Sequence, residues 1–155
     1  MGEESIAFVS EALRALLATA MLEEPPLLES REHVVLASPA DMPHDRHPRL
    51  GIFLYQVNEE ALLRVEAGKE QRPLTVSLCY LVAPVGPDSL RCQKILARVL
   101  RTLYGRGRIR VPQTGDELEL LLHQRSFEEQ TRLWLALDTP YACALYYDVR
   151  SVPLT

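Results

Sequence analysis

The segment from residue 50 to residue 57 constrains the fold most, because its apolar side chains occupy both alternating faces of a predicted strand. One face would carry Ile52 and Leu54, and the other would carry Phe53, Tyr55 and Val57. A strand that is apolar on both faces is covered by protein on both sides. The sequence therefore predicts a central strand of a sheet at this position.

Hydrophobic periodicity predicts the other elements. Apolar residues at helical spacing mark residues 6–21 and 88–103, and Gly105 would end the second helix. Ser126 and Glu129 form a capping-box pattern, which predicts a short third helix. The predicted strands cover residues 33–37, 50–57, 74–82, 117–124 and 141–149. The predicted order of elements is therefore α-β-β-β-α-β-α-β.

This order favours an α+β fold over a doubly wound parallel sheet, because the helices fall at irregular intervals. We expect a single domain over residues 1–155, with a mixed or mostly antiparallel sheet of four to five strands. Two long helices and one short helix would pack mainly on one face of it. The polar segment 58–72 is compatible with one or two helical turns capped by Asn58, or with a flexible arm.

The composition is that of an ordinary water-soluble globular protein, with 47% hydrophobic and 25% charged residues. The most apolar run, residues 16–22, is too short to cross a membrane. Glu3 and Glu4 stand where a signal peptide would carry basic residues, so we expect synthesis in the cytoplasm. The three cysteines are widely spaced in apolar segments, which is typical of core residues in a reducing compartment.

The sequence offers little for catalysis. The Gly-Arg-Gly run at 105–107 follows a helix instead of opening one, which favours a helix stop over a phosphate-binding loop. Residues 44–47 carry two histidines and an aspartate, but the neighbouring arginines and prolines favour a solvated loop over a metal site. His33 and His123 lie at predicted strands and are expected to be structural or surface residues. We predict no catalytic residue, cofactor or metal, and therefore no enzyme.

Seven of the 17 basic residues fall in a stretch that contains no acid. They are Arg91, Lys94, Arg98, Arg101, Arg106, Arg108 and Arg110. The first four recur at helical spacing and would form a cationic ridge opposite the apolar face of the second helix. Three interpretations stay open: a solvated helix face, a docking surface for an acidic protein, or a nucleic-acid track. The net charge of -4 disfavours nucleic acid, so we expect a protein partner.

The first predicted helix carries a second, shallower apolar stripe, formed by Phe8, Ala12 and Ala15. A helix that packs on one side of a monomer does not need such a stripe. Either the helix is buried on two sides within its own domain, or the stripe faces another subunit.

Several segments, taken in order, resemble one known family. They are residues 6–13 (IAFVSEAL), 52–58 (IFLYQVN), 73–82 (PLTVSLCYLV), the helix 95–103, Leu133-Trp134, Pro140-Tyr141 and residues 146–150 (YYDVR). Their order, spacing and total length resemble the tail-terminator, or cap, proteins of extracellular contractile injection systems. The similarity extends over nearly the whole chain.

The resemblance implies a structural role in a phage-tail-like particle. In that family a ring, usually of six copies, sits on the last ring of the inner tube, stops its growth and joins the sheath. The implied partners are copies of the chain itself, the inner tube protein and the sheath protein, with no membrane. Assembly is expected in the cytoplasm. A basic-patch nucleic-acid-binding module and a general protein-interaction module remain alternatives.

Candidate contact residues for such a ring lie on the second stripe of the first helix, in the proline-rich loop and in the basic stretch. They are Phe8, Ala12, Ala15, His44, Arg46, His47, Arg91, Lys94, Arg98, Arg101, Arg106 and Arg108. A closed ring needs head-to-tail contacts between two different faces of each subunit. We expect these surfaces to supply them.

Overall fold

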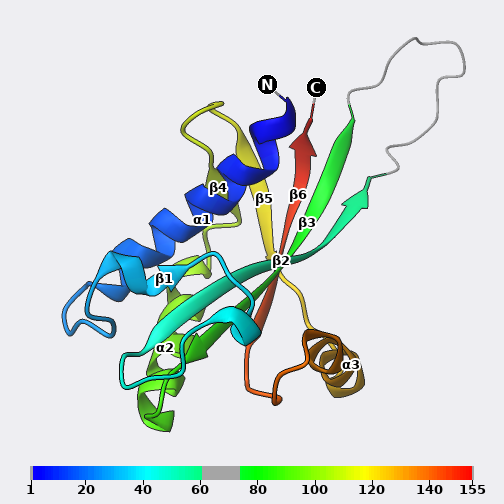
Figure 1. Cartoon of the computed structure of the whole chain (residues 1–155). Helices are drawn as coiled ribbons and strands as arrows, with labels where there is room; N and C mark the ends of the chain where they lie inside the picture. The colour runs from blue at the N-terminus through cyan, green and yellow to red at the C-terminus, as the bar shows by residue number, and fades with distance from the viewer. Residues whose placement is uncertain (1, 61–73, 155) are drawn as a thin grey trace, which may run out of the picture.

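One six-stranded sheet organises residues 2–60 and 74–154, which are the residues described by a computed structural model of the chain (Figure 1). The strands are β1 (Val34–Val35), β2 (Arg49–Glu59), β3 (Thr75–Val85), β4 (Arg108–Arg110), β5 (Glu117–Leu122) and β6 (Leu145–Pro153). The helices are α1 (Ser5–Met21), α2 (Ser89–Leu103) and α3 (Phe127–Leu137), with 3-10 turns at Gly2–Glu4, Arg31–His33 and Pro39–Asp41. The predicted α+β class, with two long helices and one short one, is confirmed.

The sheet has the strand order β1-β2-β3-β6-β5-β4. Only β1 and β2 pair in parallel, with Val34 opposite Leu50, and the other four pairs are antiparallel. The sheet is therefore mixed, but the expected count of four to five strands is wrong. The strand that the sequence pattern does not mark is β4, where Ile109 is the only buried residue of three. Three residues are too few to display an alternating pattern.

Helices α1 and α2 cover the first face of the sheet and enclose the main core. Their buried positions follow the predicted spacing, with Ile95, Val99 and Leu103 of α2 pointing inward. Asp88 caps α2, since its carboxylate accepts hydrogen bonds from two main-chain amides of the first turn. The Ser10 hydroxyl of α1 lies 2.7 Å from the Tyr80 hydroxyl of β3, which ties the helix layer to the middle of the sheet.

Helix α3 covers one end of the second face, where it forms a smaller core with β3 and β6. The predicted capping box is present: the Ser126 hydroxyl accepts from the Glu129 amide, and the Glu129 carboxylate accepts from the Ser126 amide. Trp134 is buried, and its indole N–H donates to the Tyr146 hydroxyl at 3.0 Å. Polar side chains, among them His123 and Asp148, lie on the part of this face that α3 leaves open.

The predicted central strand is present as β2, second in the sheet, and it is longer than expected. Its first half is buried, as Ile52 shows, whereas residues 56–59 are exposed. Asn58 belongs to this strand and does not cap a helix. Of the polar segment 58–72 that was assigned to a helical turn or an arm, residues 61–72 lie outside the described residues.

Two other predicted strands are present with different bounds. The strand expected over 33–37 is reduced to Val34–Val35, and the strand expected over 141–149 begins only at Leu145. Tyr141 packs instead on Phe127 and Trp134 of α3, with ring centroids 5.3 and 5.9 Å apart. Aromatic contacts with a helix therefore replace strand pairing at the start of this segment, although Tyr141 stays 45% exposed.

Candidate assembly surfaces

The four basic residues of the predicted cationic ridge on α2 have two different environments, internal and exposed. Arg98 is only 8% exposed, and its guanidinium donates to the main-chain carbonyls of Ala20, Glu23 and Pro25 at 3.3, 3.0 and 2.8 Å. The last carbonyls of a helix lack partners within the helix and carry a partial negative charge. Arg98 therefore holds the end of α1 and is not available as an external contact residue.

Arg91 shares this internal role, since it donates to the Leu27 carbonyl at 3.1 Å and is half-buried. Lys94 and Arg101 are exposed. The expected continuous ridge is thus wrong: two of its four residues anchor α2 to the chain that follows α1. Two separated cations remain on the outer surface of the helix.

The basic stretch continues around β4. Arg106 is exposed, and its Nε donates to the Thr102 carbonyl at the end of α2. Arg108 and Arg110 are the two exposed residues of β4, on either side of the buried Ile109. This outer strand of the sheet is therefore short and positively charged, two features that discourage unspecific edge pairing.

An apolar groove of about 610 Å³ opens between the second half of α2 and the end of β5. Leu100, Tyr104 and Leu122 line it and are 37%, 88% and 42% exposed. Arg101 stands at its rim, and the groove floor includes Leu120 and Tyr147, which are buried. Exposed apolar surface collected in one depression is typical of interaction sites.

The second apolar stripe of α1 is largely used inside the domain. Phe8 and Ala12 are half-buried and pack against the main core, whereas Ala15 is exposed. The interpretation of a helix buried on two sides within its own domain therefore holds for most of the stripe.

The proline-rich loop has more internal structure than the expected solvated loop. The rings of His33 and His47 stack with centroids 5.8 Å apart, and His47 Nδ1 lies 2.8 Å from a Glu29 carboxylate oxygen. The Arg49 guanidinium, 2.7 Å away, and the His47 amide lower the pKa of Asp45 to about 2. His44 and Arg46 are exposed.

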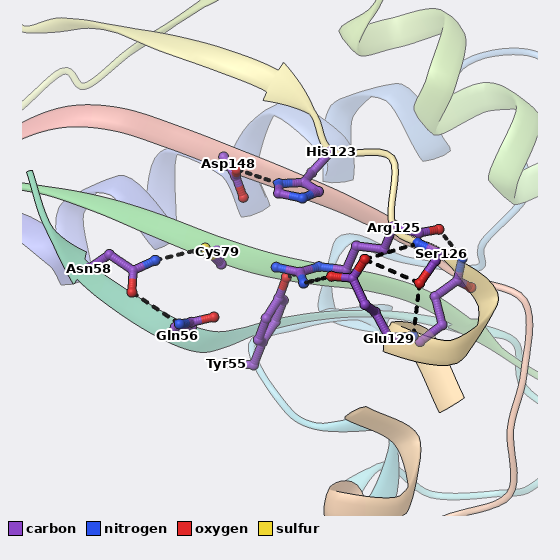
Figure 2. A network of polar contacts seen from close by, with 10 residues as sticks. Tyr55, Gln56, Asn58, Cys79, His123, Arg125, Ser126, Glu129 and Asp148 are labelled. Carbon is purple, nitrogen blue, oxygen red and sulfur yellow. Dashed lines mark hydrogen bonds and ion pairs between the residues drawn. The ribbon is translucent and has the colours of Figure 1, made fainter. Parts of the chain in front are cut away.

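A polar network crosses the part of the second face that α3 leaves open (Figure 2). His123 Nδ1 lies 2.7 Å from Asp148, a buried carboxylate of β6 whose other oxygen has no hydrogen-bond partner. Arg125 donates to the Tyr55 hydroxyl at 2.8 Å and pairs with Glu129 of the capping box. The sequence signal that could have revealed this network is Asp148, an acid within the apolar run from Leu145 to Val149.

Cys79 lies in the same network, so a nucleophile, a histidine and an aspartate occur together. The thiol is buried, and this burial, reinforced by the Asp148 carboxylate, raises the pKa of Cys79 to about 11. A catalytic cysteine needs a lowered pKa, because the thiolate is the nucleophile. The arrangement favours a structural network over a catalytic one.

Within residues 2–60 and 74–154, no group of three or more histidine, cysteine or acidic side chains is placed to bind a metal ion. No helix in this part of the chain has the length and apolar content needed to span a membrane.

Comparison with known proteins decides the family. The model of the Pvc16 N-terminal domain matches residues 8–155, which is nearly the whole chain. The chain belongs to the Pvc16 N-terminal domain family. No match was found among curated proteins.

Solved structures share the fold of this Pvc16 N-terminal domain. The sheath/tube terminator of the PVC extracellular contractile injection system, in its extended state, superposes with a TM-score of 0.68 at 18% identity. The match covers 97% of this chain and 57% of that one. The tube-terminating cap of the anti-feeding prophage gives a TM-score of 0.54 at 16% identity, covering 83% of this chain and 52% of that one. The chain thus spans a little over half the length of these relatives.

The structure brings together only some of the predicted contact residues of this Pvc16 N-terminal domain. Arg101 lines the groove beside α2 and Arg106 lies between two glycines that line it, whereas His44, Arg46 and His47 belong to the loop near β1. Exposed apolar residues of α3 and of the groove were not predicted. The exposure of these residues cannot be read from local sequence patterns, because it depends on which elements pack together. The groove, for example, arises only when α2 packs beside β5.

Proposed function

We propose that this chain is a structural, non-enzymatic cap of a contractile injection system. In this proposal, copies of the chain form a ring, expected to be a hexamer, on the end of the inner tube. The ring ends polymerisation of tube and sheath and joins the two. The observation that carries the proposal is the Pvc16 N-terminal domain match over residues 8–155, together with a fold shared with a sheath/tube terminator.

The distribution of exposed apolar side chains supports this role. The groove beside α2 exposes Leu100 and Tyr104 on the first face of the sheet. Helix α3 and the segment after it expose Phe127, Leu135 and Tyr141 on the second face. A cap contacts neighbouring copies of itself and other proteins of the particle, and these two surfaces on opposite faces provide separate sites for such contacts.

The remaining features agree with assembly rather than catalysis. Cys79 is kept protonated by burial, and the His123–Asp148 pair has a structural place between β5 and β6. We expect folding in the cytoplasm and incorporation into a phage-tail-like particle, with tube and sheath proteins as partners. The domain we assign to this role covers residues 1–155.

Deletion of the gene in a strain that makes the particle tests the proposal. Without the cap, tubes should vary widely in length, as measured by electron microscopy, because nothing ends their growth. Complementation with the unchanged chain should restore a narrow length distribution. Tubes of normal, uniform length in the deletion strain would contradict the proposal.

Direct association gives a second readout. The purified chain should co-sediment with preassembled tubes, and light scattering should detect a ring either in solution or on tube ends. A chain that stays monomeric and remains in the supernatant at high tube concentration would argue against a cap.

A further inference from the structure

Strand β5 has an unpaired outer edge beyond the point where β4 ends. The Leu120 amide donates to the Gly107 carbonyl on the β4 side, whereas the His123 amide donates to the Tyr146 carbonyl of β6. Main-chain groups alternate in direction along a strand, so the Leu122 groups point to the β4 side. Register pairing of β4 with β5 covers only Glu117 to Glu119. Among the described residues, no strand lies beside Leu122.

The apolar groove continues the line of β4 past this edge. Its walls are Ala97, Leu100 and Tyr104 of α2 and its end on one side, and Leu121 and Leu122 on the other. A strand added to the outer edge of β5 would therefore place alternate side chains against α2. Such strand addition gains affinity from main-chain hydrogen bonds and specificity from pockets for alternate side chains.

The charges at the groove indicate what the added strand carries. Arg101 lines the groove, and Arg106 lies between Gly105 and Gly107, which line it too. Within the described part of the chain, neither arginine forms an ion pair, and both are exposed. Acidic side chains in the added strand would complement them.

We propose that the groove and the outer edge of β5 bind an extended acidic and apolar segment of a different protein of the particle. The segment pairs with the main chain at Leu122 and places apolar side chains between α2 and β5. Every strand described in this chain is already part of the sheet, so the described residues contain no free strand that a second copy could add to this edge. The inference rests on the proposed assembly role, which supplies such a partner.

The test uses an array of nine-residue peptides that alternate Val, Ile, Leu or Phe with Glu, Lys or Ser, probed with the labelled full chain. Peptides with Glu should bind at least about tenfold more tightly than those with Lys. Arg101→Glu should weaken binding of the Glu peptides about tenfold or more. Lys94→Glu is the matched control, since Lys94 is an exposed cation two turns away that does not line the groove, and it should change binding less than about twofold.

Hydrogen exchange on the best peptide complex separates strand addition from side-chain docking. The amide of Leu122 should become protected, whereas that of His123 should not change, because it already donates to Tyr146. Equal binding of Glu and Lys peptides, no effect of Arg101→Glu, or unchanged exchange at Leu122 would each overturn the inference. So would a dimer in light scattering that Arg101→Glu dissociates, since the occupant would then be a second copy.

Failure of this inference is distinguishable from failure of the proposed function. A chain that caps tubes but binds no acidic peptide contradicts only the groove assignment. A chain that binds these peptides at β5 but leaves tube length uncontrolled contradicts only the cap.

Discussion

Arg98 and Asp148 are charged side chains that the fold takes almost completely out of water. A buried charge is costly unless hydrogen bonds replace its hydration. Arg98 meets this requirement with three carbonyls from the end of α1 and the chain after it. Asp148 meets it in part through His123. Both residues therefore hold together segments that are far apart in the sequence.

Replacement of Arg98 should be far more costly than replacement of its exposed neighbour. Arg98→Ala is expected to lower the free energy of unfolding by about 2–3 kcal/mol, because it removes charge-assisted hydrogen bonds and leaves carbonyls without partners. Lys94→Ala should change it by no more than about 0.5 kcal/mol. Urea denaturation monitored by circular dichroism measures both. Equal effects of the two substitutions would mean that Arg98 is not an anchor.

The three cysteines should differ sharply in reactivity. Cys79 is buried with a pKa raised to about 11, and burial also raises the pKa of Cys92, whereas Cys143 is exposed. Because only the thiolate reacts, a thiol reagent at pH 8 should label Cys143 rapidly in the native protein and all three in urea. Cys143→Ser should remove the fast phase. Rapid labelling of Cys79 in that variant would contradict its assigned environment.

At the scale of elements, α3 depends on its first turn. The Ser126 and Glu129 capping box satisfies two main-chain amides, and α3 has only the smaller core beneath it. Ser126→Ala is therefore expected to lower the free energy of unfolding by about 1 kcal/mol, whereas Ser126→Asp, which retains an acceptor, should lower it less. Chemical denaturation of the three proteins at pH 7 measures this.

The same cap predicts a pH dependence. Hydrogen bonds from Ser126 lower the pKa of Glu129 below its ordinary value of 4.5. A lowered pKa in the folded state contributes stability that is present above pH 4.5 and is lost as the pH falls through the lowered value. The difference in stability between the unchanged chain and Glu129→Gln, which resembles the protonated side chain, should therefore shrink below pH 4.5. A difference that stays constant down to pH 3 would exclude a contribution of the Glu129 carboxylate.

Some helices and strands could be predicted from the sequence, and others could not. Helix α2 was predicted almost to the residue, because its apolar positions repeat over four turns. Strand β4 was missed because three residues with one apolar side chain carry no period. The prediction of a cationic ridge was wrong for a different reason. Helical spacing places Arg98 on one side of α2, but Arg98 is buried only because the end of α1 packs against that side. The groove depends likewise on contacts between segments far apart in sequence.

At the scale of the whole molecule, the exposed apolar residues of α3 offer a test of subunit contacts. Leu135 is 75% exposed, so Leu135→Glu should leave the free energy of unfolding within about 0.5 kcal/mol of the unchanged chain. We expect it to prevent ring formation or tube binding in co-sedimentation, because it places a charge in an apolar contact. Gln113→Glu, an exposed position in the turn between β4 and β5, is the control. Normal co-sedimentation of Leu135→Glu would exclude α3 from the contact.

The two ends of the described chain emerge side by side at one pole of the molecule, far from α3 (Figure 1). Gly2 lies against the main chain of Leu154, whose amide donates to Leu74 at the start of β3. A small fluorescent or gold tag on either terminus would therefore mark the same pole, and a tag on α3 would mark the other. In images of labelled particles, this pair of tags would give the orientation of each subunit and show which pole faces the tube.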